Sequence, residues 1–427
     1  MSFIQPDSKH QLPISAAMKI LEINSVPYGS TCNIMLGIHD VAEPIGIQVD
    51  TSSGYSTHPN RNLPKNHINI GGKLDKSLHM LLARLSGYNG CFSYLATKKL
   101  IRRINQEQYD LIHLHNIHGW YLDIPMLFRY IKGHHIPVIW TFHDCWPFTG
   151  QCPHFTMAKC DKWEQGCHHC PQYQDYPQSY VDQTKKMWNL KKKWFTGVED
   201  MTIVTPSLWL ADLVKQSFLR EYPVKVINNG INLSIFKPTV SNFKAKHNIP
   251  ETTKILLGVS FGWGKRKGLD VFIELSKRLN DDYKIVLVGT DDNTDKTLPS
   301  NIISIHRTQN QTELAEIYTA ADLFVNPTRE ENYPTVNMEA LACGTPVITF
   351  KTGGSPEIID DSCGIAVDCD DIDGLETKIK QVCGQTKLST ENCLNRAATF
   401  DRNKRLKEYV ELYKSIGVRL QNYKVNN

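Results

Sequence analysis

The sequence predicts an α/β protein built from two doubly wound, Rossmann-like domains that face each other across a cleft. Two observations predict this fold. Short apolar runs alternate with longer amphipathic segments through both halves of the chain, and strands spaced by helices in this way form parallel sheets with right-handed crossovers. The length of 427 residues also accommodates two large domains.

In the first half, four apolar runs are expected to form strands, at residues 20–23, 111–115, 138–142 and 201–204. A helical pattern between the second and third of these runs covers residues 122–132 and ends at Gly133. Pro206 and Ser207 are expected to begin the helix after the fourth strand, because both residue types are common at helix N-termini.

The second half repeats the alternation. Its expected strands are residues 255–259, 283–288, 302–305, 323–325 and 346–350. A Gly/Lys loop follows the first of them and leads into a helix over residues 269–279. Ligands of such sheets bind where the carboxyl ends of the strands meet.

We place the domain boundary at Pro223, ahead of an apolar run that leads into Asn228, Asn229 and Gly230. The N-terminal domain is then expected to span residues 1–222, with 1–17 as a loose extension and 145–172 as a cysteine-rich loop. The C-terminal domain is expected to span residues 223–427, with its last helix returning to the N-terminal domain.

Composition and charge exclude several classes of protein. Hydrophobic residues make up 41% and charged residues 22% of the chain, which excludes a disordered or fibrous protein. The net charge of +4 is too small for wholesale binding of nucleic acid, so no nucleic-acid partner is expected. No apolar run is long enough to span a membrane, and the first 17 residues lack the apolar stretch of a signal peptide. We therefore expect a cytoplasmic protein.

The most informative segment is residues 329–346, which follows a strand and opens a helix. The first backbone amides of a helix are free, and its dipole favours an anion there. Glu331 precedes the helix and Glu339 lies within it, so the two carboxylates can hold hydroxyl groups at two ends of an extended polar ligand. An acidic helix cap and a solvated glutamate are the alternative on spacing alone.

Several ordered motifs carry a family resemblance. They are Glu331-x7-Glu339 followed by Ala-Leu-Ala-Cys-Gly-Thr-Pro-Val, and the segments 226–238, 353–357, 113–119 and 143–150. From about residue 18 to about residue 400 the chain resembles the retaining GT-B glycosyltransferases of family four (glycosyl transferases group 1). It is most similar to the capsular and exopolysaccharide branch, in which the C-terminal domain binds a nucleotide-sugar and the N-terminal domain binds the acceptor.

The resemblance implies roles for the residues around the donor. Glu331 would hold hydroxyls of the donor sugar and stabilise charge, and Glu339 would hold the ribose. Lys267 would neutralise the leaving phosphate, which needs a fixed cation as its negative charge grows. The remaining donor contacts are expected from residues at the helix start, which are Asn332, Tyr333, Pro334, Thr335 and Val336. Arg266 is expected to assist Lys267, and Arg307 is expected to lie near the base.

One departure concerns this cationic group. Many family members carry an arginine just after the strand, where Phe261 stands in this sequence. Arg266 is the residue that can replace that charge. The alternative for residues 265–267 is a solvated basic loop.

In the N-terminal half, the resemblance places His143 near the reacting anomeric centre, as a positioning or charge-stabilising residue, with Asp144 as a residue that could orient it. Gly29 lies in a strand-to-helix turn, where glycine allows a phosphate to approach the backbone; an ordinary turn is the alternative. His113 and His115 alternate along a strand and so share one face. They are either buried histidines of the core or a metal pair.

The resemblance implies transfer of a sugar from a UDP- or GDP-sugar to a saccharide or polyprenyl-linked acceptor in surface polysaccharide biosynthesis. The leaving phosphate would itself take the acceptor proton, with no enzymic nucleophile and no catalytic cofactor or metal. Two alternatives remain: an epimerase or sugar-phosphate transferase that uses the same cleft, and a non-catalytic nucleotide-sugar-binding module.

Four cysteines lie within a short Pro/Gly-containing segment: Cys152, Cys160, Cys167 and Cys170. Thiolates grouped in this way can close a tetrahedral structural zinc site that staples a long loop. Reduced packing thiols and a disulfide are the alternatives.

Two basic segments could rest on anionic lipid and hold the protein at the inner face of a membrane. One is residues 185–195, where lysines alternate with Trp188, Trp194 and Phe195, and the other carries Lys98, Lys99, Arg102 and Arg103. The alternative is a helix that packs its aromatic side chains into the core and leaves its lysines in water.

Overall fold

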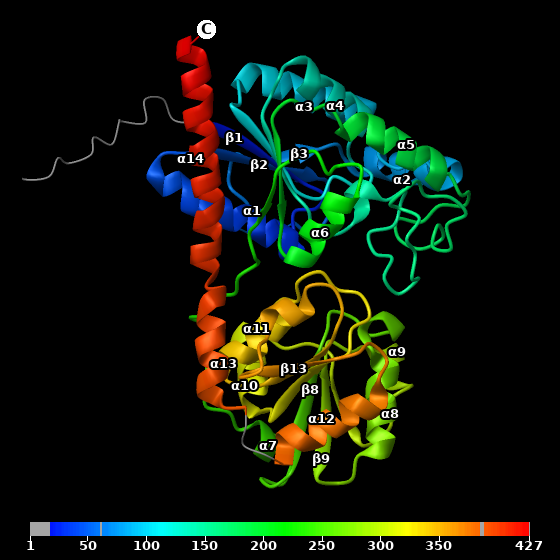
Figure 1. The fold of residues 1–427 in the computed structure, drawn as a ribbon, viewed down its shortest axis with the longest axis vertical. Helices are drawn as coiled ribbons and strands as arrows, with labels where there is room; N and C mark the ends of the chain where they lie inside the picture. The colour runs from blue at the N-terminus through cyan, green and yellow to red at the C-terminus, as the bar shows by residue number, and fades with distance from the viewer. Residues whose placement is uncertain (1–17, 60–61, 385–387, 427) are drawn as a thin grey trace, which may run out of the picture.

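The computed structural model describes residues 18–59, 62–384 and 388–426. The chain folds into two α/β domains stacked end to end, each built on one parallel sheet (Figure 1). This is the predicted pair of doubly wound domains. The loose extension expected at residues 1–17 lies outside the described residues.

The N-terminal sheet has seven parallel strands in the order β3-β2-β1-β4-β5-β6-β7. They are β1 (Lys19–Asn24), β2 (Gln48–Gly54), β3 (Ile68–Ile70), β4 (Leu111–Leu114), β5 (Val138–Thr141), β6 (Met201–Thr205) and β7 (Val224–Val226). The strand order reverses between β1 and β4, which is where doubly wound sheets open a crevice at the carboxyl ends of their strands.

Six main helices accompany this sheet: α1 (Gly29–Ala42), α2 (Lys73–Ser86), α3 (Tyr94–Glu107), α4 (Ile124–Gly133), α5 (Thr184–Phe195) and α6 (Leu208–Gln216). Ser207 caps α6 as predicted, because its hydroxyl accepts a hydrogen bond from the Leu210 amide at 3.2 Å. The Asp123 carboxylate caps α4 through the Met126 amide in the same way.

The C-terminal sheet has six parallel strands in the order β10-β9-β8-β11-β12-β13. They are β8 (Lys254–Val259), β9 (Tyr283–Val288), β10 (Ile302–Ile305), β11 (Leu323–Asn326), β12 (Val347–Phe350) and β13 (Gly364–Val367). The helices of this domain are α7 (Phe243–Lys246), α8 (Leu269–Arg278), α9 (Asp292–Asp295), α10 (Gln311–Ala320), α11 (Thr335–Ala342), α12 (Ile372–Gly384) and α13 (Thr390–Ala397).

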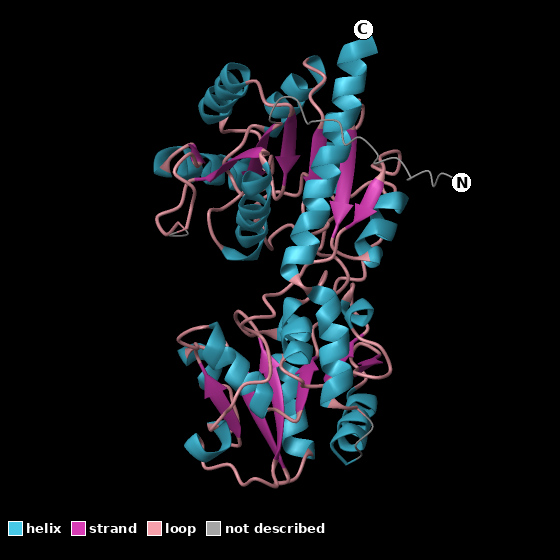
Figure 2. Ribbon diagram, turned by 90° about the vertical axis from the view of Figure 1, so that its left-hand side faces the viewer, coloured by secondary structure: helices cyan, strands magenta, loops and turns pink. Residues whose placement is uncertain are grey.

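The last helix, α14 (Arg402–Asn426), leaves the junction of the domains and runs along the N-terminal domain beside α1 (Figures 1 and 2). Tyr409 and Tyr413 of this helix share a buried apolar cluster with Ile20, Ile38 and Val49 of the N-terminal domain. The chain therefore crosses between the domains twice, and the two crossing segments pair at Ile231 and Asp401.

The boundary expected at Pro223 is one strand too early. β7 pairs with β6 through Ile203 and Val224, so it completes the N-terminal sheet instead of opening the C-terminal domain. The crossing begins after Val226, because the backbone of Ile227 makes the last bond to that sheet, donating to the Thr205 carbonyl at 2.9 Å.

Candidate active site between the domains

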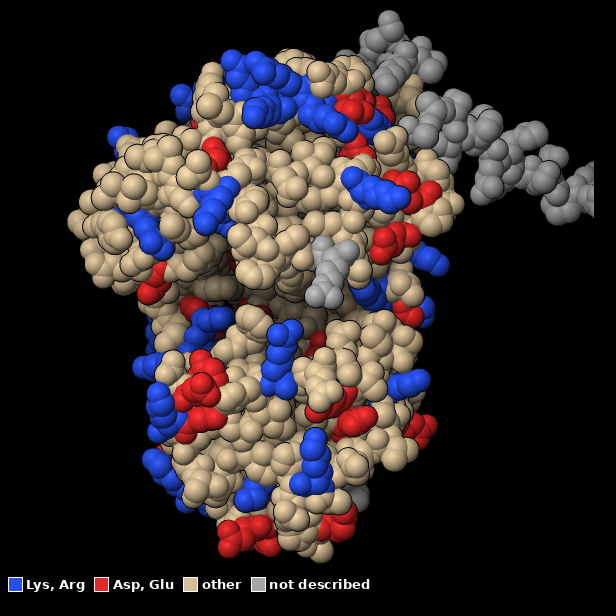
Figure 3. All heavy atoms as spheres, turned by 180° about the vertical axis from the view of Figure 1, so that it is seen from behind, with Lys and Arg blue, Asp and Glu red and all other residues tan. Residues whose placement is uncertain are grey.

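A cleft of about 650 Å³ lies between the two domains, and side chains of both domains line it. It is seen as a hollow in the space-filling view (Figure 3). The predicted site residues that line it are His143, Arg266, Lys267, Glu331, Asn332, Tyr333, Pro334, Thr335, Val336 and Glu339. Most of the predicted donor set is therefore brought together from β5, the loop after β8 and the loop that opens α11.

Lys267 and Glu331 form an ion pair in the cleft, with Nζ and Oε2 2.5 Å apart. Their side chains are only 21% and 22% exposed. Burial alone would raise the pKa of the Glu331 carboxyl, but the Lys267 ammonium beside it holds that pKa below its ordinary value. Glu331 is therefore ionised at neutral pH.

Arg329 fixes the turn that carries Lys267. Its guanidinium makes two hydrogen bonds to the Asp270 carboxylate, at 2.8 and 2.9 Å, and a third to Asp370 at 2.7 Å. It also donates to the Lys265 carbonyl, at the start of the short turn Lys265–Lys267. Bidentate arginine–carboxylate pairs are rigid as well as strong. Arg329 is the first residue of the segment 329–346 but was not among the predicted site residues.

Asn332 ties the Glu331 loop to the N-terminal domain. Its side-chain oxygen accepts a hydrogen bond from the Ser207 hydroxyl at 2.7 Å, and its amide donates to the His143 carbonyl at 3.1 Å. Glu357 strengthens the link, because its carboxylate accepts from the amides of Leu208 and Trp209 at 2.8 Å each. The side chain expected to contact the donor is thus engaged in holding the domains together.

The loop after β12 lies directly against the Glu331 loop. A Cβ at Gly353 would lie 1.8 Å from the Glu331 carbonyl oxygen, and Gly353 has a φ of +55°. Only glycine fits that approach without strain. The next amide, of Gly354, donates to the Asn332 carbonyl at 2.7 Å and holds the two loops together.

The start of α11 is open toward the cleft. Pro334 is its N-cap residue and no side chain caps the first turn, so the amides there are left for a ligand. Glu339, the fifth residue of α11, accepts a hydrogen bond from the Tyr318 hydroxyl at 3.1 Å. Burial raises the pKa of Glu339 to about 7, against the opposing effect of the hydrogen bonds from Tyr318 and Thr335. This carboxyl therefore gains or loses its proton near neutral pH.

Two predicted donor residues lie outside the lining of the cleft. Arg307 is exposed just after β10. Gly29 begins α1 with a φ of +78°, and the residues after it, Ser30 and Thr31, line the cleft in its place. Phe261 does line the cleft and is fully exposed there.

His143 reaches the cleft from the end of β5 and contacts another histidine. Its Nε2 lies 3.1 Å from Nδ1 of His115, and burial lowers the pKa of His143 to about 4. His143 is therefore neutral at physiological pH. Asp144 does not orient it: the Asp144 carboxylate pairs with His118 at 3.0 Å and accepts from the Trp146 amide.

The cysteine-rich loop contacts the donor side of the cleft. The Met157 amide donates to the Glu330 carboxylate at 3.0 Å, and the Thr156 hydroxyl donates to the Arg329 carbonyl at 3.3 Å. Four thiols of this loop surround one small cavity of about 10 Å³: Cys152, Cys160, Cys167 and Cys170. All four are free, so the disulfide alternative is not observed.

Comparisons with known proteins show which families this chain is similar to. Residues 240–411 match the family described as "Glycosyl transferases group 1", and residues 78–235 match "Glycosyltransferase Family 4". These matches support a glycosyltransferase of the GT-B fold. The putative colanic acid biosynthesis glycosyl transferase WcaC of Escherichia coli is 25% identical over 325 residues, which cover 72% of this chain and 76% of WcaC.

A second relative is the N,N'-diacetylbacillosaminyl-diphospho-undecaprenol alpha-1,3-N-acetylgalactosaminyltransferase of Campylobacter jejuni. It is 26% identical over 217 residues, which cover 48% of this chain and 57% of that enzyme. Among solved structures, sucrose-phosphate synthase of Thermosynechococcus elongatus has a TM-score of 0.68 at 17% identity, covering 94% of this chain and all of that one. Anabaena HepE in complex with UDP has a TM-score of 0.64 at 15% identity, covering 93% and 100%. At these identities the two structures show the shared GT-B fold.

Proposed function

We propose that this glycosyltransferase moves a sugar from a nucleotide diphosphate-sugar to a saccharide or polyprenyl-linked acceptor, with retention of the anomeric configuration, in surface polysaccharide biosynthesis. One observation carries the proposal: the interdomain cleft gathers Lys267, Glu331, Glu339 and the uncapped start of α11 opposite His143. This set offers cationic, anionic and amide groups for the diphosphate, the sugar and the ribose.

The diphosphate is proposed to lie at the start of α11, where free amides and the helix dipole favour an anion. Lys267 would contact the departing phosphate and Arg266 would assist it. Negative charge grows on that phosphate as its bond to the sugar breaks, so a fixed ammonium lowers the barrier. HepE was solved with UDP and also with UDP-glucose, which supports a UDP-sugar as one donor to test; a GDP-sugar is the other.

The transfer step is proposed to break the bond from the anomeric carbon to the phosphate oxygen and to form one to the acceptor oxygen on the same face. The departing phosphate takes the proton of the acceptor hydroxyl, so atoms and charges balance without an enzymic nucleophile or a catalytic metal. Glu331 would bind the donor sugar and His143 would position it. Glu339 would accept hydrogen bonds from the ribose hydroxyls.

The acceptor is proposed to bind the N-terminal domain. A second cavity, of about 310 Å³, opens there between the start of α1, the segment after β2 and α2, and Tyr28, Tyr55, Lys73 and Lys76 contribute to its walls. Two lysines in such a cavity suit the diphosphate of a lipid-linked acceptor. The name of the Campylobacter relative, which includes diphospho-undecaprenol, supports testing this class first.

The same helix presents an apolar face to solvent. Leu74, Leu78, Leu81 and Leu85 of α2 share one side of the helix and are 52–86% exposed. Basic side chains of α3 are also exposed: Lys98, Lys99, Arg102 and Arg103. We propose that these two helices contact an anionic membrane surface. No helix of the described residues is long and apolar enough to cross a bilayer.

The other basic segment, residues 185–195 in α5, does not present an exposed apolar face. In α5 the side chains of Met187, Trp188 and Phe195 are buried, and Lys191 is buried with them. The alternative reading, a helix that packs its aromatic residues into the core, describes α5. Membrane contact through residues 185–195 is therefore not proposed.

The test is calorimetric titration of UDP- and GDP-sugars in EDTA, followed by transfer assays with lipid-linked saccharides as acceptors. The proposal expects tight, metal-independent binding of one donor and transfer only when the acceptor is present. Conversion of the donor sugar without an acceptor would instead identify an epimerase. Donor binding without turnover on any acceptor would favour the non-catalytic binding module.

A further inference from the structure

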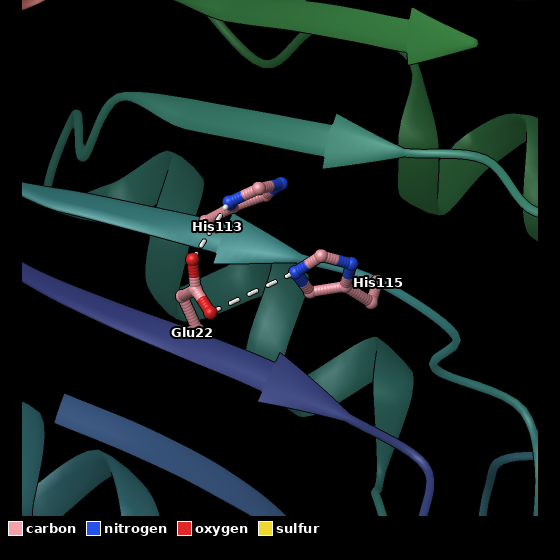
Figure 4. A group of neighbouring side chains, drawn as sticks. All are labelled: Glu22, His113 and His115. Carbon is pink, nitrogen blue, oxygen red and sulfur yellow. Dashed lines mark ion pairs between the residues drawn. The ribbon is translucent and has the colours of Figure 1, made fainter. Parts of the chain in front are cut away.

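A row of buried polar side chains leads from the cleft into the N-terminal sheet. Glu22 of β1 lies opposite His113 of β4 in the strand register, and His115 follows on the same face (Figure 4). None of the three is more than 1% exposed. His115 then contacts His143, which lines the cleft. Ionisable groups so deeply buried need partners, because an unmade hydrogen bond is costly in the core.

The partners of His113 are complete. Its Nδ1 lies 2.6 Å from the Tyr413 hydroxyl of α14, and its Nε2 lies 2.8 Å from the Thr141 hydroxyl. The Tyr413 hydroxyl in turn donates to Oε1 of Glu22 at 2.6 Å. His113 is therefore a satisfied core histidine, which was one of the two readings of the His113-x-His115 pair.

The second oxygen of Glu22 and Nε2 of His115 have no hydrogen-bond partner, although both are buried. These two atoms face each other 3.9 Å apart. A closure of about 1 Å would make an N–H···O bond of ordinary length between them. The other nitrogen of His115 bonds to His143 at 3.1 Å, with the two rings inclined by only 13°.

We propose that Glu22 is a positioning residue that sets the tautomer of His143 through His115. An ionised carboxylate can only accept, so it keeps a proton on Nε2 of His115. Nδ1 of His115 then has a lone pair and accepts from Nε2–H of His143. This leaves Nδ1 of His143 as an acceptor, and among the described residues only Nε2 of that ring makes a hydrogen bond.

A metal ion is the other ligand that Glu22, His113 and His115 could hold, since their donor atoms lie within 4.8 Å of one another. Three of the four ring nitrogens already bond to Tyr413, Thr141 and His143, however. One nitrogen and one oxygen remain, which is fewer than the three or four protein ligands of a typical zinc site. The two atoms that remain, Oε2 of Glu22 and Nε2 of His115, therefore suit a hydrogen bond between them better than a metal ion.

The consequence for the cleft is a change in what His143 offers a ligand. With Glu22 ionised, His143 accepts a hydrogen bond from a hydroxyl of the sugar or of the acceptor. If His115 instead carried its proton on Nδ1, His143 would carry its own on Nδ1. That N–H would donate a hydrogen bond into the cleft and would repel the hydrogen of the hydroxyl. This consequence rests on the proposed function, whereas the tautomer itself does not.

The experiment is ¹⁵N NMR of the histidine rings in the full chain, with His143 assigned through a His143→Gln variant. We expect Nε2 of His143 to carry the proton in the wild type. In Glu22→Gln the amide can donate to His115, so the proton of His143 should move to Nδ1. His118→Gln is the matched control, because His118 lies beside the cleft but outside this row, and it should leave His143 unchanged.

The proposal is overturned if His143 has the same tautomer in Glu22→Gln as in the wild type. It is also overturned if purified wild-type protein holds a metal that this variant loses. Should Glu22→Gln fail to fold, His115→Asn is the second test, and it should leave His143 as a mixture of tautomers. A single unchanged tautomer there would be contrary to the proposal.

Transfer assays test the role of Glu22 independently of the NMR experiment. Glu22→Gln should lower kcat by about 10- to 100-fold, as the loss of an outer hydrogen-bond partner does at other sites, with KM for the donor little changed. A chain that shows no transfer even as wild type would refute the proposed function, and the NMR result would still decide the role of Glu22.

Discussion

The Lys267 ammonium and the Glu331 carboxylate lie 2.5 Å apart, so the cation proposed for the leaving phosphate is neutralised in the free protein by the anion proposed for the donor sugar. A donor that enters the cleft brings its own negative charge to Lys267 and its own hydroxyls to Glu331. Lys267 can then bind the phosphate in place of Glu331, and Glu331 can bind the sugar hydroxyls in place of Lys267. The ion pair thus keeps two partly buried charges compensated until the donor binds.

Lys267→Ala should lower kcat/KM by about 10²- to 10³-fold, the range for loss of one preorganised electrostatic contact. The variant also leaves the partly buried Glu331 carboxylate uncompensated, so the midpoint of thermal unfolding of the protein should fall. Steady-state transfer kinetics and calorimetry measure both effects. Lys265→Ala, on the same turn but exposed, is the matched control. Equal kinetics for the two variants would indicate that Arg266, and not Lys267, stabilises the leaving phosphate.

Glu331→Gln should separate binding from catalysis. The substitution keeps the shape of the side chain and frees Lys267 from its partner, so UDP or GDP should bind at least as tightly as to the wild type. Transfer should nevertheless be lost, because the charge that stabilises the reacting sugar is gone. Titration with the nucleotide and transfer assays with the same preparation test this. Near-normal turnover would be contrary to the role proposed for Glu331.

Donor affinity should depend on pH through Glu339, whose pKa burial raises to about 7. Ribose hydroxyls donate to the ionised carboxylate, so below pH 7 binding must first remove a proton. Affinity for the nucleotide-sugar should therefore fall as the pH falls below 7, approaching about tenfold per unit. Calorimetry in two buffers of different ionisation enthalpy would detect the released proton. Glu339→Gln should bind more weakly and lose this dependence; an unchanged slope would assign the titration to another group.

The same pKa has a consequence for stability. A carboxyl whose folded pKa lies above its unfolded value favours the folded state while protonated. Its contribution is therefore present at acid pH and is lost as the pH rises through about 7. Above that pH, Glu339→Gln should unfold at a higher temperature than the wild type in the absence of donor.

The strands that the sequence analysis missed show what apolar periodicity cannot detect. β2 contains Asp50, Ser52 and Ser53, all buried. The fold satisfies these polar groups: the Tyr109 hydroxyl donates to Asp50 at 2.5 Å, and the Ser52 hydroxyl donates to the Glu22 carbonyl at 2.8 Å. Such partners come from distant parts of the chain, so β2 has the composition of a loop. β3, with three residues, offers too little pattern to detect, and β13 (Gly364–Val367) was also absent from the expected strands. β7 lies in the apolar run after Pro223, which was assigned to the wrong domain.

The candidate site was predictable where a motif is continuous along the chain. Residues 331–339 form one loop and helix start, and their sequence alone indicated an anion-binding turn between two carboxylates. The Lys267–Glu331 pair and the Arg329 contacts join segments about sixty residues apart. They depend on how β8 and β11 lie side by side in the sheet, which no local pattern encodes.

The cysteine-rich loop is proposed to hold one zinc ion. Lys191 is buried beside the loop, with Nζ 3.5 Å from the centre of the Trp146 ring, and no carboxylate of the described residues forms an ion pair with it. Burial lowers the pKa of Lys191 to about 7, and negative charge on the Cys167 and Cys152 sulfurs favours its charged form. Four thiolates on Zn²⁺ carry a net charge of −2, which would compensate that cation. As the side chains lie, the four sulfurs do not form a close ligand group within the described residues, so metal binding would draw them together.

Metal analysis of the purified protein should then find about one zinc per chain. Cobalt substitution should give the absorption of a tetrahedral thiolate site, and Cys167→Ser should abolish both signals. Cys383→Ser, which changes a thiol of the C-terminal domain, is the control and should keep the metal. Because the loop bonds to Glu330 and Arg329, removal of zinc should also weaken donor binding. Absence of metal, with every thiol titratable, would refute the zinc proposal.

Membrane contact should depend on the leucine face of α2. Replacing Leu78 and Leu85 by glutamate removes two exposed apolar side chains and adds two negative charges. Binding to vesicles that contain anionic phospholipid should therefore fall at least about tenfold in a flotation assay. Val240→Glu is the control, because Val240 is an even more exposed apolar residue but belongs to the segment that leads into the C-terminal domain.

The basic side chains of α3 should contribute to vesicle binding independently of the leucine face of α2. Each lysine near an anionic bilayer contributes about 1 kcal/mol, so Lys98→Ala with Lys99→Ala should weaken binding by about 2 kcal/mol at low salt. The loss should shrink as salt is added, because added ions screen the charges. The leucine variants should keep their defect at high salt, since apolar burial does not depend on screening. Equal vesicle binding by all variants would show that α2 and α3 face water and that the acceptor reaches the cleft without the bilayer.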